Sequence, residues 1–133
     1  MDESGTFSIS DAPADGEATV VSVTGEVDME TSPSFQRGLL RAIGAGRGGL
    51  IVDLSQASFI DSTALTSLVR AFDELRKAGG GKLAIVARDS RMRSLFEVAR
   101  LDRDFDVYSS RDEALEAVEV RDRSDPSTAS DAK

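Results

Sequence analysis

Three polar side chains stand together in the middle of the chain, at Asp61, Ser62 and Thr63. The apolar pair Phe59 and Ile60 precedes them, and a segment with helical periodicity follows. A hydroxyl here could serve as a nucleophile, with a nearby carboxylate as base or metal ligand. It could equally carry a phosphate, because the N-terminus of a helix stabilises added negative charge through its dipole and its unpaired backbone amides.

A structural role is expected for at least one of the three. A side chain at this junction should accept a hydrogen bond from a backbone N–H of the first helical turn, a contact that contributes about 0.5 to 2 kcal/mol. Capping does not by itself explain why three such residues stand side by side. Because the cap uses only one of them, capping and phosphorylation are compatible.

Catalysis is disfavoured by what the chain lacks. It contains no histidine and no cysteine, so a serine nucleophile would need an unusual base, and its few lysines are not obviously placed to act as one. A Mg²⁺ site stays open as an alternative, because Asp53 and Asp61 bracket the carboxyl end of a predicted parallel strand. We predict a protein that is not an enzyme and that has no cofactor and no resident metal.

Two glycine clusters, at 44–49 and 79–82, superficially resemble phosphate-binding loops. A phosphate-binding loop runs from a strand to a helix, whereas both clusters here run from a predicted helix to a predicted strand. Gly44 and Gly79 are therefore predicted to end helices with a positive φ. No nucleotide site is inferred.

The elements that must position the junction follow from hydrophobic periodicity. Strand-like runs at 6–10 and 17–27, separated by a turn-rich stretch at 11–16, predict two antiparallel strands. Helices are expected over 32–43, with Ser32 as N-cap and Pro33 at the first helical position, and over 62–78. The alternation then continues with strands at 49–55, 81–88 and 105–108 and helices at 90–101 and 111–120. The apolar stripe expected on the second helix comprises Leu65, Leu68, Val69, Phe72 and Leu75.

Length and charge narrow the function classes. With 133 residues the chain is long enough for one domain, which we place at 1–120, and the polar segment 121–133 is expected to be a disordered tail. No apolar stretch is long enough to cross a bilayer, and the acidic N-terminus does not resemble a signal peptide, so a cytoplasmic protein is expected. The net charge of −8 disfavours nucleic acid and favours a neutral or basic partner surface.

The order of elements and four stretches of sequence resemble the STAS domains, in particular the anti-sigma factor antagonists, from about Thr6 to Val120. The specific stretch is "LIVDLSQASFIDSTAL"; the others are "VTGEVDMETSPSF", "GGGKLAIVA" and "FDVYSSRDEAL". The resemblance implies a single α/β domain with a mixed, mostly parallel sheet and helices largely on one face. Ala64 stands where the family usually has glycine, and Thr63 where serine is common.

What the resemblance implies for function is a bacterial partner switch that regulates transcription, often under stress. The unmodified antagonist binds an anti-sigma factor that is also a serine kinase, is released by phosphorylation, and is reset by a phosphatase. By motif position the phosphoacceptor is Ser62, and Asp28, Asp61, Thr63 and Ala64 face the partner. A capping or turn role is the alternative for Asp28, and Asp53 is interpreted as structural. The rival function is an accessory subunit of a membrane transporter or a sensor complex.

Overall fold

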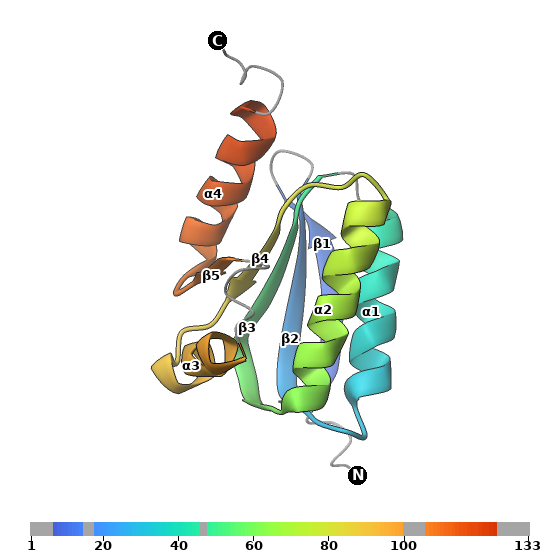
Figure 1. Ribbon diagram of the computed structural model, residues 1–133, viewed down its shortest axis with the longest axis vertical. Coiled ribbons are helices and arrows are strands. Elements are labelled where there is room, and N and C mark those ends of the chain that lie inside the picture. Colours follow the sequence, from blue (N-terminus) through green and yellow to red (C-terminus); the bar gives the residue numbers. More distant parts are fainter. Residues whose placement is uncertain (1–6, 15–17, 46–47, 100–105, 125–133) are drawn as a thin grey trace.

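Within residues 7–14, 18–45, 48–99 and 106–124, which this computed structural model describes, five strands alternate with four helices (Figure 1). The strands are β1 (Ser8–Pro13), β2 (Thr19–Val27), β3 (Leu50–Ile60), β4 (Leu83–Val86) and β5 (Asp106–Tyr108). The helices are α1 (Ser32–Ala45), α2 (Ser62–Lys77), α3 (Ser90–Val98) and α4 (Arg111–Ser124).

All described strands belong to one mixed sheet in the order β1-β2-β3-β4-β5. β1 is antiparallel to β2, and the remaining neighbours are parallel. β3 is therefore the central strand, as its run of apolar residues predicts, since a parallel strand covered on both faces buries consecutive side chains. β1 extends through Pro13, so the prediction of a turn beginning at residue 11 is wrong for the first three residues of that stretch.

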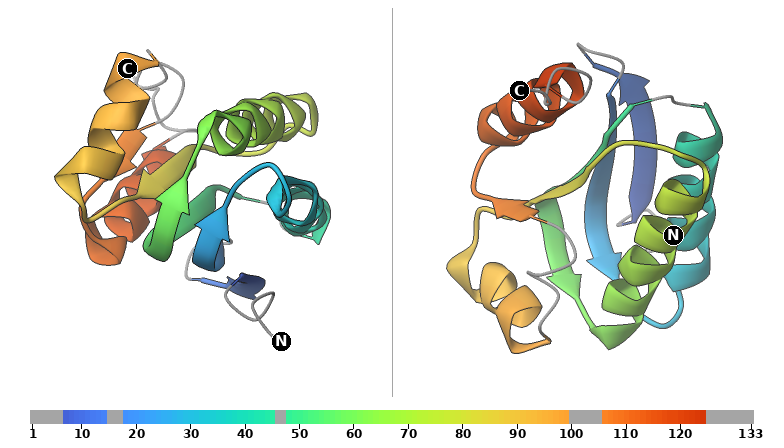
Figure 2. Two further views of the ribbon diagram at one scale, coloured as in Figure 1. Left: turned by 90° about the horizontal axis from the view of Figure 1, so that it is seen from below. Right: turned by 45° about the horizontal axis from the view of Figure 1, so that its top comes forward.

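The sheet is covered unequally on its two faces (Figures 1 and 2). α1, α2 and α3 contribute Phe35, Leu68 and Phe96 to one large hydrophobic cluster on the same face. α4 covers the other face, where Val118 packs in a smaller cluster with Ile51 of β3. The expectation of helices largely on one face is confirmed, with α4 as the exception.

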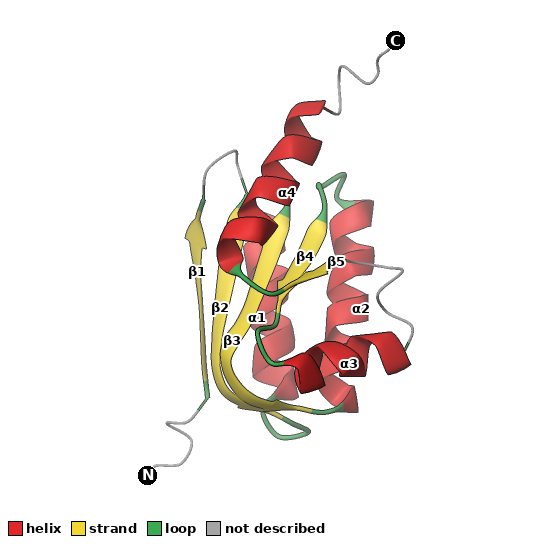
Figure 3. Ribbon diagram, turned by 90° about the vertical axis from the view of Figure 1, so that its left-hand side faces the viewer, coloured by secondary structure: helices red, strands yellow, loops and turns green. Residues whose placement is uncertain are grey.

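β3 is longer than its sequence pattern predicts because its pairing with β2 is irregular. The register shifts between Ser22 and Thr24 and again between Gly25 and Glu26, and β3 accommodates the extra residue each time. Gly25 has a φ of 93°, a conformation that favours glycine, at the second of these places. Such bulges bend a strand, and Figure 3 shows the end of β3 curving toward the start of α2.

The buried face of α2 differs from the predicted apolar stripe. Leu68 and Leu75 are buried as expected, but Val69 is 38% exposed. The other buried residues of α2 are small, namely Ala64, Ser67 and Ala71. Small side chains here allow α1 and α2 to pack side by side, which is why the largest apolar residues do not mark the contact face.

The two predicted helix-ending glycines behave differently. Gly79 has a φ of 74°; its N–H donates to the carbonyl of Arg76, and the N–H of Gly80 donates to that of Leu75, the Schellman pattern of helix termination. Gly44 lies inside α1 and is not among the glycines with positive φ, so that prediction is wrong. α1 continues for one more residue because nothing at Gly44 forces the chain to turn.

At the C-terminal end, α4 continues through Ser124, four residues past the helix end expected at residue 120. The remainder of the segment that was expected to be a tail, 125–133, lies outside the described residues.

Candidate functional site

The predicted site residues come from two segments that the parallel sheet brings to one end. Val27 and Ile60 are paired across β2 and β3, and the N–H of Asp61 donates to the carbonyl of Val27 at 3.2 Å. Because parallel neighbours end at the same edge of a sheet, Asp28 and Asp61 both follow the strands there. The junction at the start of α2 therefore lies beside the turn between β2 and α1.

Asp61 is the N-cap of α2, which confirms the prediction that one residue of the polar group caps this helix. Its carboxylate accepts hydrogen bonds from the backbone N–H of Thr63 at 2.9 Å and of Ala64 at 3.4 Å. The Thr63 hydroxyl also donates to this carboxylate. That hydroxyl is the main cause that lowers the pKa of Asp61 below its ordinary value, with the backbone N–H groups adding to the effect.

The two neighbouring hydroxyls differ in their surroundings. The Thr63 hydroxyl is held by Asp61, and the Thr63 side chain is only partly exposed. Ser62 is exposed, and its hydroxyl has no hydrogen-bond partner within the part of the chain that the structure describes. Only its backbone carbonyl is engaged, by the hydroxyl of Thr66 at 3.1 Å. Ser62 thus offers the unengaged hydroxyl of the junction.

Ala64 is placed differently from its polar neighbours. Its side chain has no exposed surface and belongs to the core cluster under α2. The methyl group that replaces a hydrogen of glycine is therefore accommodated in the core. Because the whole residue, backbone included, has no exposed surface, Ala64 offers nothing for a partner to contact in this conformation.

Asp28 organises the turn that leads into α1. Its carboxylate accepts from the backbone N–H groups of Glu30 at 3.0 Å and Thr31 at 3.1 Å, which is the turn role that was its alternative. The prediction that Ser32 caps α1 is wrong. The Ser32 hydroxyl instead lies against α2, 3.3 Å from the carbonyl of Thr63 and 3.0 Å from the hydroxyl of Ser67.

Asp53 does not join this site. β3 runs on to Ile60, so Asp53 lies eight residues before Asp61, roughly 25 Å along an extended strand. Its carboxylate accepts from the guanidinium of Arg111 at 2.7 and 2.9 Å and from the N–H of Ser55 at 2.9 Å. The proposed pairing of Asp53 with Asp61 in a metal site is therefore wrong.

The pKa of Asp53 reflects two opposing effects. Burial by itself raises the pKa, because it disfavours the charged form, but the hydrogen bonds from Ser55 and Arg111 together outweigh it. The net pKa lies below the ordinary value, so the carboxylate is charged at neutral pH. Asp53 therefore ties β3 to the first residue of α4 by an ion pair.

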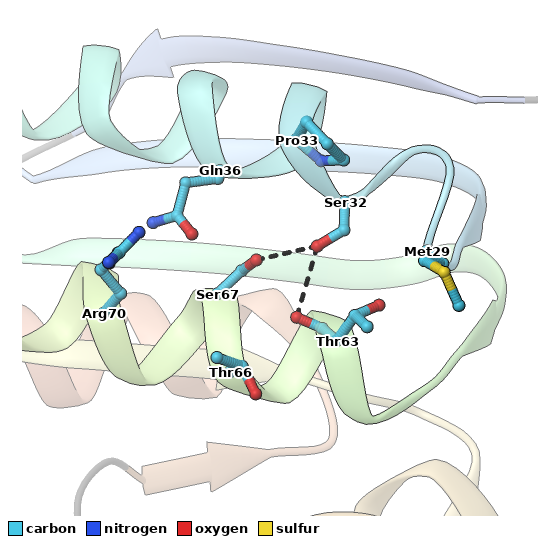
Figure 4. A pocket seen from close by; sticks show the side chains of 8 residues that line it. All are labelled: Met29, Ser32, Pro33, Gln36, Thr63, Thr66, Ser67 and Arg70. Atoms are coloured by element: carbon cyan, nitrogen blue, oxygen red, sulfur yellow. Dashed lines mark hydrogen bonds between the residues drawn. The ribbon is translucent and has the colours of Figure 1, made fainter.

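A groove between α1 and α2 adjoins the junction and was not predicted from the sequence (Figure 4). It has a volume of about 520 Å³. Its lining comprises Met29, Ser32, Pro33, Gln36, Thr63, Thr66, Ser67 and Arg70. The available signal was Ser67, a polar residue one position from the predicted apolar stripe of α2, which indicates a polar contact between helices.

Two classes of feature are not found in the described part of the chain. No three acidic side chains there lie close enough to hold a metal ion. No helix among those residues has the length and hydrophobicity required to cross a membrane.

Two known mycobacterial proteins that are similar to this chain in sequence or structure are described as anti-sigma factor antagonists. The chain is 27% identical over 99 residues to the anti-sigma-F factor antagonist RsfB of Mycobacterium tuberculosis, covering 74% of this chain and 80% of that protein. The crystal structure of an anti-sigma factor antagonist from Mycobacterium paratuberculosis is 28% identical, with a TM-score of 0.73 over 89% of this chain and 98% of that one.

A second structure shows the fold alone. The Bacillus cell fate determinant SpoIIAA in its phosphorylated form is 20% identical, with a TM-score of 0.63 over 84% of this chain and 99% of that one. The sequence profile of the STAS domain matches residues 10–114, which include both strand ends and the whole of α2. Together with the sheet order and the capped junction, this match shows that the chain belongs to the STAS domain family.

Proposed function

We propose that this chain is an anti-sigma factor antagonist that binds an anti-sigma factor with serine kinase activity and is released by phosphorylation at Ser62. The observation that carries the proposal is the exposed hydroxyl of Ser62, which has no partner among the described residues, at the capped start of α2. The two mycobacterial proteins named as antagonists, at 27% and 28% identity, support the assignment of the regulatory class.

In the proposed reaction the kinase supplies the catalytic machinery and this chain supplies the acceptor. The Ser62 oxygen attacks the γ-phosphorus of ATP, a new O–P bond forms, and the bond to the ADP oxygen breaks. The hydroxyl proton passes to a base of the kinase. A phosphatase reverses the modification by transferring the phosphoryl group to water, so the chain itself is a substrate and not an enzyme.

The junction suits this reaction for two reasons. A phosphate on Ser62 would stand at a helix N-terminus, where the dipole stabilises negative charge. It would also add a charge of about −1.5 to −2 next to the Asp61 carboxylate, on the surface that we propose binds the partner. Phosphorylation is therefore expected to leave the fold intact and to exclude the partner directly, through the bulk of the phosphate and the cost of burying its charge beside the like charge of Asp61.

Asp28 and Asp61 give the proposed docking surface its charge. Both are acidic and lie at the same edge of the sheet, so a partner with basic groups is favoured. Raising the salt concentration should slow association, because screening weakens the attraction between exposed charges. A salt-independent association rate, with Asp28→Ala and Asp61→Ala both neutral for binding, would remove the electrostatic part of this proposal.

The experiment that tests the proposed function is a pulldown with the tagged full chain, followed by mass spectrometry. An antagonist should recover a soluble anti-sigma factor kinase, whereas the rival role would recover a permease or a sensor assembly. The recovered kinase, purified and supplied with ATP, should label Ser62. A label found on Thr63 by phosphopeptide mapping would contradict the assignment of Ser62 as the acceptor, but the proposed antagonist function would still stand.

A further inference from the structure

The far end of the groove between α1 and α2 holds more hydrogen-bond donors than acceptors. Gln36 and Arg70 point toward one another across this end, about two helical turns from the junction (Figure 4). The Nε2 atom of Gln36 is buried and has no hydrogen-bond partner. Arg70 is exposed, and within the described residues it has neither a hydrogen bond nor an ion pair.

The excess of donors does not depend on how the Gln36 amide is turned. A guanidinium carries five N–H donors and no acceptor, and a primary amide carries two donors and one acceptor. Exchanging the amide nitrogen and oxygen would give Arg70 one acceptor and leave the remaining donors unpaired. The nearby hydroxyls of Ser32 and Ser67 are hydrogen-bonded to each other, and within the described residues neither forms a hydrogen bond with Gln36 or Arg70.

The charge of the groove differs from that of the junction. Arg70 is the one charged residue among those that line the groove. The neighbouring acidic residues on α2, Asp73 and Glu74, lie next to Lys77, and Asp73 also lies next to Arg76. On a chain with net charge −8, the groove therefore ends in a cation that no described carboxylate neutralises.

The near end of the groove is apolar. Met29 is 75% exposed, and Pro33, which also lines the groove, is exposed. An apolar side chain seated here would be removed from water, whereas a polar one would lose solvation. The occupant that fits both ends therefore combines an apolar side chain with a carboxylate.

From this arrangement we infer that the groove is a docking site for a segment of the protein partner that carries an acidic side chain. The inference rests on the proposed function, because it names a second contact of the same partner. The partner's carboxylate accepts hydrogen bonds from the exposed Arg70, beside the Gln36 amide (Figure 4), and its apolar side chain packs against Met29. Eight residues of helix separate Ser62 from Arg70, which corresponds to about 12 Å. The partner thus presents a basic group over the junction and an acidic group roughly 12 Å away.

Such a pattern of opposite charges would provide specificity. A partner with basic groups alone would satisfy the junction but would place a cation opposite Arg70, and like charges in a docked interface are unfavourable. The groove would therefore select among the anti-sigma factors that a cell contains. Phosphorylation of Ser62 would act at the other end of the contact and would not change which partner the groove selects.

The test uses the anti-sigma factor recovered in the pulldown and measures its dissociation constant for the full chain by calorimetry. Arg70→Glu should weaken binding by about tenfold or more, because it reverses the charge opposite the partner's carboxylate. The matched control is Arg41→Glu, which makes the same change of charge at an exposed position of α1 outside the groove lining. The control should stay within about twofold of the parent.

Gln36→Glu gives a second variant with nearly the same shape. Its carboxylate would pair with Arg70 within the chain and occupy the place of the partner's carboxylate, so binding should weaken while thermal stability is kept or raised. If it binds as the parent does, the groove does not hold a carboxylate.

The outcomes separate this inference from the proposed function. Parent binding that Arg70→Glu leaves unchanged, or an equal loss in Arg41→Glu, would overturn the groove site and leave the antagonist function standing. Failure of the parent to bind any anti-sigma factor would overturn both. Saturable binding of inorganic phosphate at Arg70, seen by NMR titration of the free chain, would assign the groove to a small anion instead.

Discussion

Asp53 and Asp61 both have a pKa below the ordinary value for aspartate, but they have different structural roles. Asp53 is 8% exposed and pairs with Arg111, a residue 58 positions away. Among the described residues, the Asp61 carboxylate accepts hydrogen bonds only from α2, namely from the backbone N–H groups of Thr63 and Ala64 and from the Thr63 hydroxyl. The first carboxylate joins two elements, whereas the second orders a junction that stays accessible. The comparison teaches that similar electrostatics can indicate a fold contact or an exposed site, and that the partners decide which.

Breaking the Asp53 contact is expected to have the largest effect on stability. Arg111→Met removes the guanidinium and leaves a buried carboxylate with Ser55 as the remaining described residue that donates to it. Removing one partner of a fully buried pair costs about 3 to 5 kcal/mol, and since the Arg111 side chain is 47% exposed we expect about 2 kcal/mol. Urea unfolding would measure this loss. A change below about 0.5 kcal/mol would mean that the ion pair does not hold α4 to the sheet.

The same variant should show a pH dependence of known sign. In the parent, the lowered pKa of Asp53 gives stability that is present above the ordinary value of 3.8 and is lost as the pH falls through the lower pKa of the folded state. In Arg111→Met the unpaired carboxylate is neutralised on acidification, so its penalty disappears. The difference in unfolding free energy between parent and variant should therefore narrow from pH 7 toward pH 3. A constant difference would indicate that the charge of Asp53 is not involved.

How much of this contrast the sequence could predict depends on how local each contact is. The cap at Asp61 was predictable, because it joins residues two and three positions apart at a visible change of periodicity. The pairing of Asp53 with Arg111 was not, since it depends on α4 crossing to the other face of the sheet. The length of β3 was also missed, because the continuous apolar run from which it was predicted ends near Ser55, whereas two register shifts against β2 let the strand continue to Ile60.

Contacts between helices were the other point at which sequence patterns failed. Hydrophobicity marked Val69 as buried, yet the structure buries Ser67 and exposes Val69. The reason is that Ser67 forms a hydrogen bond with Ser32 across α1 and α2, which allows a polar side chain at a close helix contact. Donors such as Gln36 could be assigned to a groove only after the helices had been placed side by side.

Removing the cap should have an intermediate effect. Asp61→Ala deprives the N–H groups of Thr63 and Ala64 of their acceptor, and we expect a loss of about 1 kcal/mol. Asp61→Asn keeps a side-chain oxygen at the same place and should recover most of it. Thermal melts of the two variants beside the parent separate the cap from the charge. Equal losses in both would show that the charge of Asp61, and not its hydrogen bonds, stabilises α2.

The smallest effect on stability is expected at Ser62, although the same residue should have a large effect on binding. Ser62 is exposed and its hydroxyl has no described partner, so Ser62→Ala should change the unfolding free energy by less than about 0.5 kcal/mol. This variant should bind the kinase partner but escape release, because it cannot be phosphorylated. Ser62→Glu should fold as the parent does and bind about tenfold or more weakly, since it places a bulkier charged side chain, which a docked partner would have to bury, beside the like charge of Asp61. Thermal melts and binding isotherms on the same samples would test both variants.

A folded Ser62→Glu that binds as tightly as the parent would call for the same measurement on the chain phosphorylated at Ser62, because a carboxylate carries less charge than a phosphate. If the phosphorylated chain also bound tightly, direct exclusion at the junction would be wrong, and the exposed hydroxyl would no longer distinguish this end of the molecule from the buried contact at Asp53.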